Sequence, residues 1–244
     1  MEERKLSYFA SDVHLGLKNG SEDEREARFV SFLESIPADK TKNLFLLGDI
    51  WDFWYEYKYV VPKGYIRVFA ALDKLIQKGV RVFFFPGNHD VWAFDYFRSL
   101  GMVVIKDKFA CIDIDGNIFC LGHGDGLGKV PYTYRFLRGL FHNRFAQFCF
   151  SLLHPRIAFA IGNAWSHSNR MSRHVKYTFK GEEEPLYKFA VELCKERKAD
   201  HFIFGHYHSP ASYILPSGAT FDILDDWFDA NSYMVWDGES LTRI

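Results

Sequence analysis

Five short blocks of the sequence place metal-type side chains directly after an apolar run. The blocks read SDVH, LGDIWD, GNHD, GHGD and GHYH, and their polar residues are carboxylates, imidazoles and one amide. These residues are Asp12, His14, Asp49, Asp52, Asn88, His89, Asp90, His123, Asp125, His206 and His208. One such block alone is commonly a turn or a helix cap. Five of them in one chain, each after a strand-like run, indicate one shared metal site.

The composition of this ligand set suggests which metals it would hold. It contains no thiolate, and its mixture of imidazole and carboxylate suits Mn²⁺, Fe²⁺ or Zn²⁺ better than Ca²⁺ or Mg²⁺. A carboxylate can bridge two ions, and Asp49 is the natural choice. Two metals about 3.5–4 Å apart can clamp the oxygens of a phosphoryl group and activate a water molecule. We therefore expect two divalent ions, in the first place Mn²⁺, with Fe²⁺ or Zn²⁺ as alternatives.

The elements that must position these blocks alternate between strand and helix in the first half of the chain. Strand patterns occur in KLSYFASD, NLFLLGD and VRVFFFPGNHD, and helical patterns occur over residues 22–36 and 64–79. This order predicts an α/β fold with buried parallel strands, whose carboxyl ends form the site. Because residues i and i+2 of a strand share a face, we expect Asp12 with His14 to hold one centre, and His206 with His208 likewise.

The second half contains more strands. Residues 108–121 predict a hairpin around Asp115-Gly116, and residues 184–199 predict a helix. HFIFGHYH predicts another strand with a polar exit, and residues 211–241 have a β-rich pattern. No repeat or linker interrupts the chain, so we expect a single domain over residues 1–244.

The length, composition, net charge and cysteine content narrow the class of protein. The chain has 244 residues, 48% of them hydrophobic, which provides for a large core and argues against disorder. A net charge of -1 predicts no general affinity for nucleic acid. The sequence contains no run of 18 apolar residues, so we expect no transmembrane helix. Cys111, Cys120, Cys149 and Cys194 form no C-x-x-C pair, and no signal peptide is visible. We expect reduced, mostly buried thiols in a cytosolic protein.

A segment between two of the blocks has an unusual charge balance. Gly126 to Lys180 contains nine Lys or Arg, eleven aromatic residues and no Asp or Glu, whereas the rest of the chain has 21 basic and 31 acidic residues. Its helical, amphipathic pattern, as in RFLRGLFHNRFAQFCFSLL, predicts a helical cap over the site. A solvated basic face, an anionic lipid or a nucleic acid would each fit this composition. The apolar stripe favours acyl chains.

The five blocks, in this order, resemble those of the calcineurin-like metallophosphoesterases. The resemblance implies a sandwich of two mixed β-sheets flanked by helices, with a two-metal site. It implies one metal held by Asp12, His14, Asp49 and His208, and a second held by Asp49, Asn88, His123 and His206.

The chain also resembles one branch of that family, the UDP-2,3-diacylglucosamine diphosphatases of lipid A biosynthesis. GDIWDFW, HGD, the helical insertion and LDDW at residues 224–227 carry this resemblance. It implies hydrolysis of the pyrophosphate of UDP-2,3-diacylglucosamine to UMP and 2,3-diacylglucosamine 1-phosphate, at the cytoplasmic face of the inner membrane. Known members of the branch read G-N-R-D, with the Arg on a substrate phosphate, whereas this chain has His89.

Roles for the remaining residues follow as expectations. His89 would donate a hydrogen bond or proton, Asp90 would orient His89 or cap the next helix, and Asp52 would orient a ligand histidine. Substrate contacts implied by the resemblance are Asn88, His89, His206 and, in the cap, Ser166, Asn169, Arg170 and Arg173. We expect no nucleic acid and no obligate protein partner.

Two other functions stay open. One is a different metallophosphoesterase, acting on nucleotides, phosphodiesters or phosphoproteins. The other is a nucleic-acid-binding protein whose basic insertion grips RNA or DNA while the metals are structural.

Overall fold

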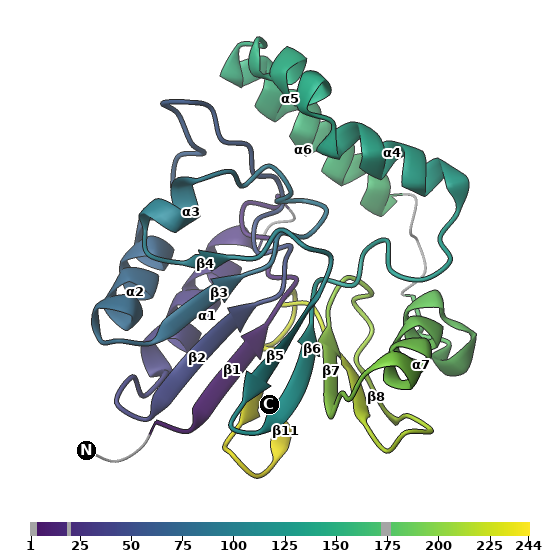
Figure 1. Cartoon of the computed structure of the whole chain (residues 1–244). Helices are drawn as coiled ribbons and strands as arrows, with labels where there is room; N and C mark the ends of the chain where they lie inside the picture. Colours follow the sequence, from purple (N-terminus) through teal and green to yellow (C-terminus); the bar gives the residue numbers. More distant parts are fainter. Residues whose placement is uncertain (1–3, 19–20, 172–176) are drawn as a thin grey trace.

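Two mixed β-sheets pack face to face, with helices on their outer sides (Figure 1). The computed structural model describes residues 4–18, 21–171 and 177–244, with only the backbone described at 167–171. In the six-stranded sheet the order is β11 (Leu241–Arg243), β10 (Tyr233–Trp236), β1 (Leu6–Ala10), β2 (Thr41–Leu46), β3 (Arg81–Phe84) and β4 (Val103–Val104). Strands β1 to β4 are parallel, and β10 and β11 are antiparallel to their neighbours.

The second sheet has five strands and carries the remaining blocks. Its order is β5 (Ala110–Ile114), β6 (Asn117–Leu121), β7 (His201–Phe204), β9 (Thr220–Ile223) and β8 (Ala211–Ile214). Strands β6, β7 and β9 are parallel, and β5 and β8 pair antiparallel at the two edges. The predicted α/β sandwich of two mixed sheets is confirmed.

Three buried clusters hold these layers together. Phe45 of β2 packs with Phe9 and Phe119 between the two sheets, while its neighbours Leu44 and Leu46 pack beneath the helices. This alternation is the period of two that a strand imposes on its side chains. On the outer faces lie α1 (Glu22–Ser35), α2 (Ile66–Gln77) and α3 (Tyr96–Ser99) over one sheet, and η1 (Gly181–Glu183) and α7 (Pro185–Glu196) over the other.

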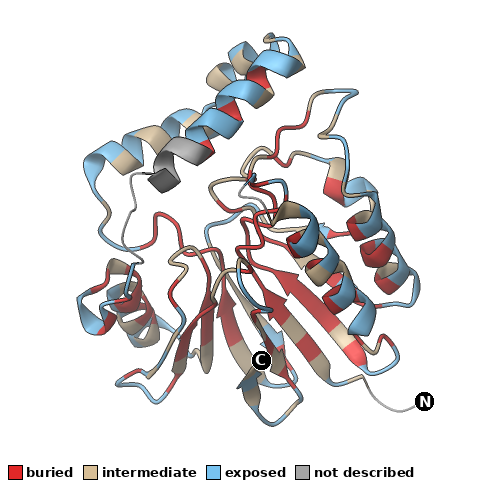
Figure 2. Ribbon diagram, turned by 180° about the vertical axis from the view of Figure 1, so that it is seen from behind, coloured by how far each residue is buried: buried red, intermediate tan, exposed pale blue. Residues whose placement is uncertain are grey.

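Three further helices lie above the carboxyl ends of the parallel strands (Figure 1). They are α4 (Tyr132–His142), α5 (Arg144–Ser151) and α6 (Pro155–Met171), all within the segment that was predicted to form a cap. Helices α4 and α5 bury no residue completely, and much of their surface is exposed (Figure 2). Within the ranges given above, no helix combines the length and apolar character needed to cross a bilayer.

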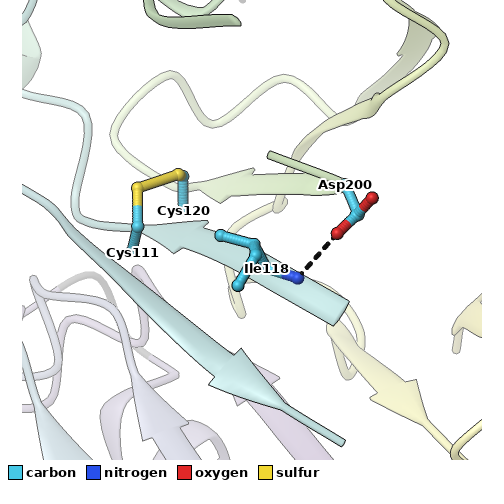
Figure 3. The surroundings of a disulfide bond; sticks show 4 residues. All are labelled: Cys111, Ile118, Cys120 and Asp200. Atoms are coloured by element: carbon cyan, nitrogen blue, oxygen red, sulfur yellow. Dashed lines mark hydrogen bonds between the residues drawn. A yellow bond between two sulfur atoms is a disulfide. The ribbon is translucent and has the colours of Figure 1, made fainter. Parts of the chain in front are cut away.

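The predicted hairpin is present, but the expectation for its cysteines is wrong. Strands β5 and β6 meet at Asp115-Gly116, and their register places Cys111 opposite Cys120. With Cα atoms 4.1 Å apart, the two residues form a disulfide (Figure 3). They are equidistant from the Asp-Gly turn, so the hairpin pattern carried the signal although no C-x-x-C spacing was present. Cys149 is a free exposed thiol, which also contradicts the expected burial.

The amino end of β6 is fixed to the neighbouring strand by a side chain. Asp200, just before β7, accepts a hydrogen bond from the backbone N–H of Ile118 at 2.8 Å (Figure 3). This bond extends the β6–β7 pairing by one contact, so the strands carrying the GHGD and GHYH blocks keep a common register.

Candidate metal centre and its cavity

The five blocks meet at the edge of the sheets where β1, β2, β3, β6 and β7 end. Their metal-type residues have an unusual backbone, with φ values of 54° at Asp12, 51° at His14, 51° at Asp49, 72° at His206 and 49° at His208. Residues other than glycine rarely adopt this left-handed conformation, and such strained residues concentrate at functional sites. The strand ends therefore hold these side chains in orientations that a regular strand would not provide.

One cluster joins Asp12, His14 and His208. The Nε2 atoms of His14 and His208 lie 3.3 Å apart, and Asp12 Oδ1 lies 3.4 Å from His208 Nε2. The other nitrogen of each ring faces a carboxylate, with His14 Nδ1 3.3 Å from Asp52 Oδ1 and His208 Nδ1 3.1 Å from Asp226 Oδ2. A proton on each Nδ1 leaves the two Nε2 lone pairs facing one another, as two ligands of one cation do.

A second cluster joins Asp49, His123 and His206. His123 Nδ1 donates to the carbonyl oxygen of Leu47 at 2.9 Å, so its Nε2, 3.2 Å from Asp49 Oδ2, has a lone pair to offer. Asn88 Oδ1 is also buried and has no hydrogen-bond partner among the described residues, and His123 Nε2 faces the Asp49 carboxylate. Buried acceptors are normally paired, so a cation is the partner that fits them.

Asp49 lies between the two clusters. Its Oδ2 is 3.9 Å from His14 Nε2 in the first cluster and 3.2 Å from His123 Nε2 in the second. Its Oδ1 accepts from the backbone N–H of His89 at 2.8 Å. This position between two imidazole groups is the one that a bridging carboxylate requires.

The expectation from strand alternation that His206 and His208 hold one centre together is wrong, whereas the division implied by the resemblance, with His208 in one group and His206 in the other, matches the two clusters. Both residues lie beyond the end of β7 at Phe204, and the left-handed backbone turns their rings toward different clusters. The alternation of a strand therefore does not apply to them. Asp12 and His14 do share a cluster, as expected.

Two glycines allow this close packing. A Cβ on Gly87 would overlap Asp49 Oδ1, and a Cβ on Gly205 would overlap Asp12 Oδ2. Only a residue without a side chain leaves room for these carboxylates. The glycines of the GNHD and GHYH blocks are therefore needed to make room for the carboxylates of Asp49 and Asp12.

Burial and mutual charge set the protonation of the ligands. Burial opposes ionisation of Asp49, yet the imidazoles of His123 and His89 hold the pKa of this carboxyl well below its usual range. Burial, followed by the nearby His123, lowers the pKa of His206 to about 3. An ionised carboxylate and a neutral imidazole are the forms that bind metal. Asp49 and His206 are thus in the forms that fit divalent cations, whereas His123, whose pKa is raised by the Asp49 carboxylate against the effect of burial, must release a proton to bind one.

Asp52 and Asp90 have different surroundings. Asp52 lies against His14, and its carbonyl oxygen accepts from His89 Nδ1 at 2.8 Å. Asp90 is fully buried, and its carboxylate accepts from backbone N–H groups at Gly87 (2.6 Å), Ile50 (2.8 Å) and, at 3.3 Å, Asp49 and Trp51. It thus ties together the loops after β2 and β3. Neither expected role of Asp90, orienting His89 or capping a helix, matches these contacts.

The structure describes the four predicted substrate contacts of the cap to different extents. Ser166 is 1% exposed and donates its hydroxyl to Asp52 Oδ2 at 2.7 Å, so it contacts the core of the protein, and its expected substrate contact stays a prediction. Asn169 and Arg170 lie on α6, where only the backbone is described. Arg173 lies outside the described residues.

A cavity of about 810 Å³ extends from the metal-type residues to the cap. At one end it is lined by Asp49, Asn88, His89, His206 and His208. At the other end its lining is mostly apolar and comes largely from the cap: Phe53, Val91, Trp92, Leu137, Leu140, Phe141, Ala146, Phe150, Ile161 and Trp165.

The cavity also contains an ion pair whose cap partner the sequence did not single out. Arg138 of α4 donates from Nε to Asp125 Oδ2 at 2.8 Å, and Tyr134 donates to the same oxygen at 3.3 Å. Asp125 belongs to the GHGD block, so this pair joins the cap to the core. Asp226, the partner of His208, lies in the LDDW stretch, whose pattern alone does not indicate this contact.

The sandwich and its two ligand clusters define a metallophosphoesterase, and comparison with known proteins agrees. The model of the calcineurin-like phosphoesterase family matches residues 7–210, and the chain belongs to this family. It is a metal-dependent phosphoester hydrolase.

Individual relatives carry a more specific name. UDP-2,3-diacylglucosamine hydrolase of Porphyromonas gingivalis is 34% identical over 98% of this chain and 96% of the relative. The enzyme of the same name from Neisseria meningitidis is 29% identical over 96% of this chain and 95% of the relative. Among solved structures, a dimetal phosphatase from Danio rerio aligns over 99% of this chain and 98% of that chain, at 12% identity and a TM-score of 0.48.

Proposed function

We propose that this protein hydrolyses the pyrophosphate of UDP-2,3-diacylglucosamine, with UMP and 2,3-diacylglucosamine 1-phosphate as products, in lipid A biosynthesis. The observation that carries the proposal is the cavity, because one continuous space joins the phosphoesterase residues to an apolar chamber under the cap. The substrate in the name of these relatives has two parts that correspond to the two ends of the cavity. Its nucleotide diphosphate would lie at the phosphoesterase residues, and its two acyl chains would lie in the apolar chamber.

The apolar chamber favours this substrate over other phosphoesters. A nucleotide or a phosphoprotein loop would leave its ten mostly apolar lining residues in contact with water. Acyl chains remove that surface from water, which stabilises binding by about 0.8 kcal/mol for each buried CH₂ group. In this proposal residues 126–180 act as a cap on a single domain of residues 1–244.

The metal centre is proposed to hold two divalent ions, Mn²⁺ in the first place and Fe²⁺ or Zn²⁺ as alternatives. Asp12, His14 and His208 would hold one, Asn88, His123 and His206 the other, and Asp49 would bridge them. Bound ions of this kind supply an activated water and stabilise charge on a phosphoryl group. Asn88 and His206 line the cavity, so both also lie within reach of a substrate phosphate.

His89 and Arg138 are the proposed phosphate contacts outside the ligand set. Both line the cavity. His89 Nδ1 is held by the carbonyl oxygen of Asp52, so the ring has a fixed orientation toward the site. Known enzymes of the branch have an Arg at the position of His89. In this chain Arg138, anchored through Nε by Asp125, supplies a guanidinium from the cap instead.

The outer surface of the cap supports a peripheral position on the cytoplasmic face of the inner membrane. Six large apolar residues of the three cap helices and the α5–α6 turn are exposed and lie outside the cavity lining: Tyr132, Phe136, Phe145, Phe148, Leu152 and Ile157. Basic residues Arg135, Arg144 and Arg156 are exposed on the same helices. Exposed aromatic and basic side chains suit the interface of an anionic bilayer. No nucleic acid and no obligate protein partner are needed in this scheme.

The proposal is tested with purified protein, Mn²⁺ and UDP-2,3-diacylglucosamine, measuring UMP release. Ala146→Phe fills the apolar chamber and should raise KM for this substrate while leaving hydrolysis of bis-p-nitrophenyl phosphate unchanged. Ala164→Phe, on the exposed side of α6 and outside the cavity lining, is the matched control. Turnover of the small phosphodiester without any UMP release would refute the lipid substrate but leave the phosphoesterase assignment standing.

A further inference from the structure

Helix α6 of the cap seats directly on the loop that follows β2. Ala158, Gly162 and Ser166, spaced four residues apart, are all buried, whereas Asn163 and Ala164 between them are exposed. Residues at this spacing share one face of a helix. A Cβ on Gly162 would overlap the ring of Phe53, so that ring lies against the helix backbone.

Two further contacts hold α6 against this loop. Phe53 also packs edge-on against Phe159 of α6, with ring centroids 5.6 Å apart. The preceding residue, Asp52, accepts from Ser166 Oγ at 2.7 Å. Asp52 and Phe53 together thus form the point of the core that receives α6.

Asp52 connects the contact between α6 and the core with the metal centre. While one oxygen of its carboxylate accepts from Ser166, the other lies 3.3 Å from His14 Nδ1, and its carbonyl oxygen holds His89 Nδ1 at 2.8 Å. Ser166, Asp52 and His14 are 1%, 4% and 0% exposed. Water therefore does not compete strongly for these contacts, and the orientation of the Asp52 carboxylate depends on both neighbours.

We propose that Ser166 is a positioning residue for the metal centre. It holds the Asp52 carboxylate in the orientation that fixes the tautomer and ring plane of His14, so that seating of the cap raises metal affinity. Because such coupling is reciprocal, a bound metal in turn stabilises the seated cap. The inference rests on the metal centre of the proposed function but does not depend on the lipid substrate.

The experiment measures Mn²⁺ binding to the metal-free protein by calorimetric titration. In Ser166→Ala the affinity should fall roughly two- to tenfold, the range expected for one lost hydrogen bond. Ser166→Thr, which restores a hydroxyl, should recover it. Asn163→Ala, on the exposed side of the same helix, should bind Mn²⁺ like the wild type.

Gly162→Ala provides an independent variant, because its added methyl group pushes α6 away from Phe53 without replacing any polar side chain. It should also weaken Mn²⁺ binding. A folded Ser166→Ala protein with wild-type affinity overturns the proposal. If Ser166→Ala does not fold, a folded Gly162→Ala protein with wild-type affinity overturns it. Neither measurement uses the nucleotide-lipid, so failure of the lipid assignment would be seen separately in the UMP assay.

Discussion

His14 and His208 place their Nε2 atoms 3.3 Å apart, although 194 positions separate them in the chain. Each ring is oriented from behind by a carboxylate, Asp52 for His14 and Asp226 for His208. Two lone pairs facing one another at this distance repel unless a cation or a proton lies between them. This pair is therefore the most direct sign that the site binds metal.

Replacing single ligands should remove metals in a defined pattern. His208→Ala should lose about one equivalent of Mn²⁺, because its cluster would retain only Asp12, His14 and the shared Asp49. Asp49→Ala should lose both, because Asp49 contacts both clusters. Metal content after gel filtration, measured by plasma mass spectrometry, checks this. His154→Ala, an exposed histidine of the cap, is the control. An Asp49→Ala protein that retains two metals would exclude the bridging role.

Metal binding should release protons near neutral pH. Burial alone would lower the pKa of His123, but the Asp49 carboxylate 3.2 Å away raises it well above the usual 6.5. In the metal-free protein this ion pair stabilises the fold fully below pH 6.5, and the stabilisation is lost as pH rises through the raised pKa. Since Mn²⁺ needs the neutral ring, its affinity should increase with pH over the same range.

Calorimetry distinguishes this mechanism from simple binding. Titrations of Mn²⁺ at pH 7, in two buffers with different ionisation enthalpies, should give different apparent enthalpies, because the released proton is taken up by the buffer. Identical enthalpies in both buffers would show that His123 is already neutral and would contradict the prediction.

His89→Ala should separate catalysis from metal binding. His89 lines the cavity, and its Nδ1 is held by Asp52, so we expect it to act on the substrate phosphate. Loss of a proton donor of this kind lowers kcat by about 10²–10⁴-fold. Metal content should stay near that of the wild type, with His154→Ala as the control. A purified His89→Ala protein without metal would instead show that His89 is a ligand, since its Nε2 lies 4.0 Å from Asp49 Oδ2 and it forms a third group of possible ligands with His14 and Asp49.

Asp90→Asn should destabilise the fold more than it alters the chemistry. The carboxylate accepts from four backbone N–H groups, and an amide nitrogen in place of one oxygen would face donors. The loss of charged hydrogen bonds in a buried site predicts a cost of at least about 2 kcal/mol in the free energy of unfolding. Urea unfolding measures it, with the exposed Asp73→Asn as the control. Wild-type stability together with lost activity would instead restore a catalytic role for Asp90.

Arg138→Gln should raise KM for UDP-2,3-diacylglucosamine by about tenfold, the effect expected for losing a charge-assisted contact with phosphate. The matched control is Arg135→Gln, an exposed residue of α4 that does not line the cavity. If kcat fell while KM stayed constant, Arg138 would act in the transition state alone. Equal kinetics for both variants would remove Arg138 from the phosphate site.

Much of this protein could be predicted from local patterns in the chain. Apolar runs that stop at SDVH, LGDIWD, GNHD, GHGD and GHYH predicted both the strands and the residues that gather at their ends. This worked because parallel strands bring their carboxyl ends to one edge, whatever the sequence between them. The hairpin around Asp115-Gly116 was equally visible, since turn residues act locally.

Other features depended on contacts between distant segments. The left-handed backbone at His206 and His208 sends the two rings to different clusters, against the alternation that a strand pattern implies. The buried side of α6 decided that Ser166 donates a hydrogen bond to Asp52. The sequence alone therefore determined which chemistry gathers at the sheet edge. Only the tertiary structure decided which side chain contacts which, because those pairings depend on how loops and cap pack together.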